Sequence, residues 1–151
     1  MKIRTDFVTN SSSSSFVLGF KDKGSVGKTI QKEKKKMMND KWYGISEKDY
    51  RLLLKDCKEK GKTFEEVLKD ISSEFDSRAR WEDYKQHCFY DSKFEHNPEF
   101  IANAVKMYTE NFKRNAEGND YFVYVEYDDH ETMLDYALRN APFTIEWFSH
   151  H

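Results

Sequence analysis

Two polar segments near the end of the sequence carry side chains that could hold a metal ion. One is Asp128-Asp129-His130-Glu131, and the other is His150-His151. Carboxylates and imidazoles together suit a divalent transition metal, which can activate water at neutral pH. The competing interpretation is structural, because Asp128 and Glu131 could cap a following helix and chain ends usually fray. The pattern therefore defines a metal hypothesis and a structural alternative.

A run of short polar side chains near the start of the chain is the second candidate site. Its first four residues are Asn10, Ser11, Ser12 and Ser13. Hydroxyls, an amide and loop N–H groups suit an anion such as phosphate. Low-complexity serine more often forms a flexible linker, but here only residues 9–15 separate two patterned segments. A ligand-binding loop and a plain polar turn both remain open.

Three further features carry weaker signals. The segment 24–29 resembles the end of a phosphate-binding P-loop, but Asp22 stands where the motif requires glycine. The lysine-rich run 32–36 lacks interleaved aromatic side chains and indicates a solvated helix face rather than a nucleic-acid surface. The separation of Cys57 and Cys88 does not match that of a close metal-binding pair of cysteines, so we expect both to be small, buried hydrophobic side chains.

The strands that would position these residues follow from period-2 hydrophobicity. Residues 2–8 and 16–20 carry apolar side chains at every second position and predict an antiparallel hairpin. Residues 121–127 and 143–148 predict two more strands, with a helix between them that Pro142 stops. A helix between two strands of one sheet favours a parallel crossover. All four strands should share one mixed sheet, because an isolated hairpin is only marginally stable.

The middle of the chain predicts a run of helices. A weak helix is expected over about 28–40, Ser46 with Asp49 resembles a capping box, and Thr63 with Glu66 should open a further helix. A separate short helix should carry Trp81, Tyr84 and Cys88, and Asn97-Pro98 predicts another helix start. The aromatic stripes on these helices are expected to be core. The residues expected to be largely buried are Phe64, Leu68, Ile71, Ile101, Val105 and Tyr108.

The fold class is therefore α+β, with residues 1–151 forming a single domain around a small mixed four-stranded sheet. If strands 121–127 and 143–148 are parallel, their carboxyl ends share one edge of that sheet. Residues 128–130 would then approach His150 or His151, with Asn10 and Ser11 nearby. Ligand sites in open sheets with crossover helices lie beyond the carboxyl ends of strands.

Composition limits the classes of partner. The chain has 27 acidic and 25 basic residues and a formal net charge of −2. With this balance, the chain as a whole has no net electrostatic attraction for nucleic acid or for a membrane surface. The start lacks a signal-peptide pattern, and no apolar run approaches the roughly 18 residues that span a bilayer. We expect a cytoplasmic protein whose partner is another protein.

Residues 2–16 read Lys-Ile-Arg-Thr-Asp-Phe-Val-Thr-Asn-Ser-Ser-Ser-Ser-Ser-Phe. This segment resembles an N-terminal signature shared by many small, uncharacterised bacterial and phage-borne proteins. The ending Ser149-His150-His151 is similar to that of some of them. The resemblance implies that the serines and the terminal histidines are native, and it favours a functional loop over a plain turn. It implies no activity, cofactor or partner.

Two hypotheses from different classes follow. The first is a non-catalytic binding protein that acts through its surface or its serine loop. The alternative is a divalent-metal-dependent phosphoester hydrolase with its site at the sheet edge. A third idea is that residues 2–16 form a segment that another enzyme recognises or modifies.

Overall fold

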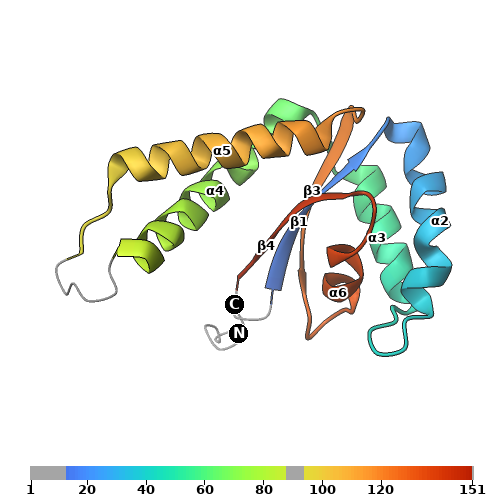
Figure 1. Cartoon of the computed structure of the whole chain (residues 1–151). Coiled ribbons are helices and arrows are strands. Elements are labelled where there is room, and N and C mark those ends of the chain that lie inside the picture. Colours follow the sequence, from blue (N-terminus) through green and yellow to red (C-terminus); the bar gives the residue numbers. More distant parts are fainter. Residues whose placement is uncertain (1–12, 88–93, 151) are drawn as a thin grey trace. The chain divides into compact units, whose positions relative to one another are not determined.

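The structure of the chain is a computed structural model that describes residues 13–87 and 94–150 (Figure 1). It has the α+β composition that the sequence predicts. The chain forms two compact units, one from residues 1–67 with 118–151 and the other from residues 68–117. Within the described ranges, every helix lacks the length or the apolarity that crossing a membrane requires.

The first unit is built on a sheet whose strand order is β2-β3-β1-β4. β1 (Ser13–Phe20) lies at its centre and pairs antiparallel with both β3 (Tyr121–Asp128) and β4 (Thr144–Ser149). β2 (Gly61–Lys62) adds two residues beside β3, also antiparallel. Three of the four predicted strands are thus present. The predicted strand 2–8 and its hairpin lie outside the described residues.

The prediction of a mixed sheet is wrong for the strands that the structure describes, because every strand pair among them is antiparallel. β3 and β4 run in the same direction, as predicted, but β1 lies between them. The physical reason is that β1 is apolar on both faces, with Phe16, Val17 and Leu18 all fully buried. A strand of this kind suits the centre of a sheet better than its edge.

Three helices cover one face of this sheet (Figure 1). They are α2 (Val26–Met38), which follows a short 3₁₀ turn (Lys23–Ser25), α3 (Glu47–Glu59) and α6 (Leu134–Arg139). The core between helices and sheet includes Phe16, Leu18, Phe20, Ile30, Leu53, Val123, Leu134 and Leu138. The predicted capping box of Ser46 with Asp49 and the predicted helix start at Thr63 with Glu66 are confirmed, since each pair exchanges side-chain and backbone hydrogen bonds.

The second unit contains most of α4 (Phe64–His87) and all of α5 (Pro98–Ala116). Asn97 caps α5 as predicted, with its Oδ1 accepting the N–H groups of Glu99 and Phe100. The helices pack through Ala79, Ile101 and Ala104, and the ring of Phe75 contacts those of Tyr108 and Phe112.

Two expectations for this region are corrected. α4 is one continuous helix through residue 87, so the separate short helix is not present. Trp81 and Tyr84 stack on each other at the surface instead of entering the core, with ring centroids 5.6 Å apart. Among the six predicted core positions, Ile71 and Ile101 are buried. The other four, Phe64, Leu68, Val105 and Tyr108, are only half-buried.

Candidate functional sites

Three polar side chains lie close together at the end of β3. The ligand-type atoms of Asp128, Asp129 and His130 all lie within 4.8 Å of one another. The backbone N–H of His130 donates to Asp128 Oδ1 at 2.7 Å, which closes the turn. Asp129 Oδ1 is shielded from solvent, and no hydrogen bond to it is found in the described parts of the chain. His130 Nε2 lies 3.9 Å from this oxygen.

The structural alternative for this segment, in which Asp128 and Glu131 cap the next helix, is wrong. α6 begins only at Leu134, whose N–H donates to Thr132 Oγ1 at 3.1 Å. The carboxylate of Asp128 accepts the N–H of His130 instead. The acidic side chains at this turn therefore do not serve the helix.

His150 lies at the same end of the sheet but outside this group. Ser13 pairs with Asp128 on one side of β1, and Ser14 pairs with Ser149 on the other. The width of two strand spacings, roughly 10 Å, therefore separates the ends of β3 and β4. His150 Nε2 lies 2.8 Å from Ser15 Oγ, and the backbone N–H of His150 donates to the carbonyl of Ser13. The other predicted ligands, His151, Asn10, Ser11 and Ser12, lie outside the described residues.

The described part of the serine run is strand rather than loop. Ser13, Ser14 and Ser15 begin β1, and all three are buried. Ser14 Oγ lies 3.4 Å from an Arg139 guanidinium nitrogen. That guanidinium is held by the fully buried carboxylate of Asp135 through two hydrogen bonds of 3.0 and 3.2 Å. Burial and this network give the serines structural roles in the strand.

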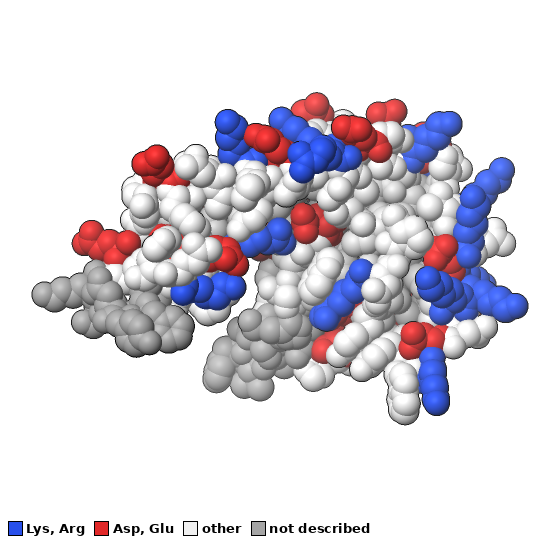
Figure 2. Space-filling view, in the orientation of Figure 1, with Lys and Arg blue, Asp and Glu red and all other residues white. Residues whose placement is uncertain are grey.

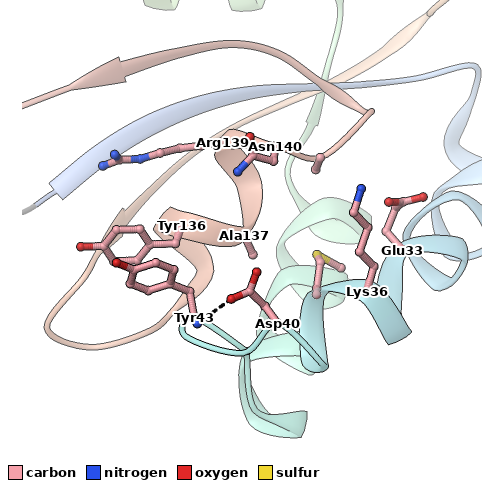
Figure 3. A pocket seen from close by; sticks show the side chains of 10 residues that line it. Glu33, Lys36, Asp40, Tyr43, Tyr136, Ala137, Arg139 and Asn140 are labelled. Atoms are coloured by element: carbon pink, nitrogen blue, oxygen red, sulfur yellow. Dashed lines mark hydrogen bonds between the residues drawn. The ribbon is translucent and has the colours of Figure 1, made fainter.

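A pocket of about 300 Å³ lies within the first unit between α2, the segment that follows it, and α6 (Figure 3). Its lining comprises Glu33, Lys36, Met37, Asp40, Tyr43, Tyr136, Ala137, Arg139, Asn140 and Ala141. The rings of Tyr43 and Tyr136 lie flat against each other on one side, with centroids 4.2 Å apart and planes 14° apart. Asp40 holds the loop by accepting the N–H groups of Trp42 and Tyr43 at 2.9 and 2.8 Å.

The charged side chains on the α2 side of this pocket form no ion pairs within the described structure. Glu33 and Lys36 lie side by side on one face of α2, and neither has an ion-pair partner within the described ranges. Basic side chains gather where α2 lies (Figure 2), and the sequence of α2 is rich in lysine. Next to Tyr43, the side chain of Trp42 is 75% exposed. The pocket can therefore offer both charge signs and two aromatic surfaces to a ligand.

The buried polar groups beneath α3 are structural rather than reactive. Burial, with the nearby charge of Asp56, raises the pKa of the Cys57 thiol to about 12. Burial and the hydrogen bond to Asp56 also raise the pKa of the Tyr127 phenol, whose O–H donates to Asp56 Oδ2 at 2.7 Å. A neutral buried thiol is a poor nucleophile. Cys57 is the small buried hydrophobe that the sequence predicts.

The sequence alone does not reveal the α2–α6 pocket. Its residues come from two segments about a hundred positions apart, and each looks ordinary alone: a lysine-rich helix and a short apolar one. The one local signal was the aromatic pair Trp42-Tyr43 inside a polar stretch. No protein family, no curated protein and no solved structure matches this chain at a significant level.

Proposed function

We propose that this chain is a non-catalytic binding protein and that the α2–α6 pocket receives a segment of a partner protein. The observation that carries the proposal is the combination of Glu33 and Lys36, which have no ion-pair partner among the described residues, with the stacked tyrosines and with the exposed Trp42 that precedes Tyr43 in the chain. Exposed aromatic side chains around a small concave site are typical of the residues that dominate binding energy at protein interfaces.

The chemistry of the lining favours a peptide segment over a purely apolar ligand. The floor includes Met37 and two alanines, and the walls carry both charge signs. A backbone with one charged and one apolar side chain would satisfy these groups together. A volume of about 300 Å³ lies at the lower end for small-ligand pockets, which suits one or two side chains.

The test is a selection of peptides from a random phage-displayed library on the immobilised protein, followed by affinity measurement with the purified peptides. Trp42→Ala is expected to weaken binding by about tenfold or more, as for an interface hot spot. Trp81→Ala is the matched control, because Trp81 is also an exposed tryptophan but belongs to the other unit. Lys36→Gln should weaken binding, whereas Lys35→Gln, one residue away and outside the pocket lining, should not.

Two outcomes would contradict the proposal. Selected peptides that bind Trp42→Ala as tightly as the parent would place the interface elsewhere. Equal losses for the lysine variants at positions 35 and 36 would indicate general charge attraction instead of a pocket. Amide chemical shifts near Tyr43 and Tyr136 provide an independent location for the bound peptide.

The second candidate function is a divalent-metal-dependent phosphoester hydrolase, and its first requirement is a metal site. The convergence of Asp128, Asp129 and His130, with a shielded carboxylate oxygen, favours such a site. A metal that binds only the folded state stabilises it by about 2.7 kcal/mol at a hundredfold excess over its dissociation constant. We expect Zn²⁺ or Mn²⁺ to raise the melting temperature of the parent but not of Asp129→Asn.

Asp120→Asn is the matched control for the metal experiment, since Asp120 is an exposed acid just before β3. It should keep the full metal-induced shift. His150→Ala should also keep it, because His150 contacts Ser15 and lies outside the group. An unchanged melting temperature with Zn²⁺, Mn²⁺, Ni²⁺ and Mg²⁺ would leave the hydrolase without its metal and remove this candidate.

A further inference from the structure

The second unit contains a carboxylate that orients two imidazole rings. Asp83 is fully buried on α4. Its Oδ1 lies 2.8 Å from His87 Nδ1, and its Oδ2 lies 3.1 Å from His96 Nδ1 and 2.9 Å from the N–H of Asn97. Burial alone raises the pKa of Asp83, but the hydrogen bonds from Asn97, His96 and His87 outweigh it and hold the pKa below its ordinary value.

The protonation pattern of both rings follows from this arrangement. An ionised carboxylate only accepts hydrogen bonds, so the Nδ1 atoms of His87 and His96 must both carry hydrogen. The bonds to Asp83 therefore leave the Nε2 atom of each ring without a partner among the residues that the structure describes. A buried carboxylate that fixes an imidazole in one tautomer is the arrangement that prepares histidine to bind or exchange protons with a ligand.

His96 also lines a cavity of about 650 Å³ between α4 and α5. Two cationic side chains, Arg80 and Lys106, line the same cavity. Arg80 donates through Nε to Asp76 at 2.8 Å, so its terminal guanidinium nitrogens are not used in that bond. Lys106 has no ion-pair partner in the described portion of the chain. With Asp76 the sole acid in the lining, positive charge exceeds negative charge.

The remaining wall is apolar. Ile101 and Val105 lie one turn apart on α5 and face the cavity. A ligand that fits this lining carries a negative group for Arg80, Lys106 and His96, and an apolar body for the α5 wall. Pockets of this volume with mostly apolar walls and a few placed polar groups are typical of small-molecule sites.

We propose that the cavity between α4 and α5 binds a small organic anion, a carboxylate or a phosphate monoester with an apolar body, through Lys106, Arg80 and the Nε2 atom of His96. This site is separate from the α2–α6 pocket and does not depend on the function proposed for it. Lys106 and Arg80 supply the charge. Asp83 positions His96 without itself contacting the ligand.

The experiment is an amide chemical-shift titration of the full chain with phenyl phosphate and with benzoate. A dissociation constant on the order of 1 mM is expected for probes of this size. Shifts should concentrate at residues 76–80 and 96–106. Tighter binding of phenyl phosphate would identify the phosphate monoester as the preferred headgroup, and tighter binding of benzoate would identify the carboxylate.

Variants with matched controls test the roles of the side chains. Lys106→Gln is expected to weaken binding about tenfold through loss of a charge-assisted contact. Lys113→Gln, an exposed lysine on the same helix outside the lining, should have no effect. His96→Gln should weaken binding, while His87→Gln, which removes the other ring bonded to Asp83, should not.

Three results would overturn the proposal. One is no saturable shift with either probe at about ten times the expected dissociation constant. Another is shifts confined to residues outside the cavity lining. The third is an equal loss for the lysine variants at positions 106 and 113. Because both lysines are on the surface, these variants are expected to fold, which keeps the test decisive even if the histidine variants do not.

Discussion

The ion pair between Asp135 and Arg139 on α6 allows a direct test of what burial does to electrostatics. Asp135 is fully buried, and within the part of the chain that the structure describes its two oxygens accept hydrogen bonds from Arg139. Asp76 and Arg80 on α4 have the same residue types, the same four-residue spacing and a similar Nε–Oδ distance, 2.8 Å against 3.0 Å. The side chains of that second pair are 46% and 50% exposed. The two pairs therefore differ mainly in burial.

Arg139→Met keeps much of the apolar stem of the side chain and leaves the Asp135 carboxylate without its partner. Breaking a buried pair in this way costs about 3–5 kcal/mol. We expect the lower end, about 3 kcal/mol, because Asp135 lies in the first turn of α6, where the helix amides favour a negative charge. Arg80→Met breaks an exposed pair and should cost only about 0.3–0.5 kcal/mol.

Urea unfolding followed by circular dichroism measures both effects. With a slope of about 2 kcal/mol per molar, Arg139→Met should lower the midpoint by about 1.5 M, and Arg80→Met by about 0.2 M. The double variant Asp135→Leu with Arg139→Met should recover most of the loss, because it removes the unpaired charge. Equal midpoints for the two single variants would refute the argument that burial decides the cost. Failure of the double variant to recover would show that the loss comes from packing of Arg139 against Tyr136 and Trp147.

Three further predictions concern buried polar groups. Tyr127→Phe should lower the free energy of unfolding by about 1.5–3 kcal/mol, because Asp56 loses a short buried hydrogen bond; an unchanged urea midpoint would contradict this. Cys57 should resist iodoacetamide at pH 8 in the native protein, since its pKa is raised to about 12, and peptide mass spectrometry would reveal any modification. The pKa of Asp83 is lower in the folded state than its ordinary value. The ionised carboxylate therefore contributes its full stabilisation to the folded protein above the ordinary pKa, and this stabilisation is lost as the pH falls through the lower folded pKa. Asp83→Asn should therefore lose stability less steeply than the parent below about pH 4, as measured by thermal unfolding across that range.

Local features of the fold could be predicted because their interactions span only a few residues. The capping boxes at Ser46 and Thr63 and the cap at Asn97 each join a side chain to a backbone amide within one helical turn. The approximate positions of β1, β3 and β4 follow from short apolar segments of the sequence, although the serines that begin β1 were expected to form a loop. The turn at residues 128–130 is local as well, and so its three polar side chains could be picked out together.

Tertiary structure decided the features whose residues are distant in sequence. The order of the strands depends on which one can be buried on both faces. β1 therefore separates β3 from β4, and His150 stays outside the group at the end of β3. The orientation of His96, which lies just before α5, depends on Asp83, thirteen positions earlier on α4. The α2–α6 pocket brings together residues about a hundred positions apart. Periodicity along one element indicates which face is buried, but it does not say what that face meets. Only the packed chain brings these charges and rings together, and the candidate binding sites arise there.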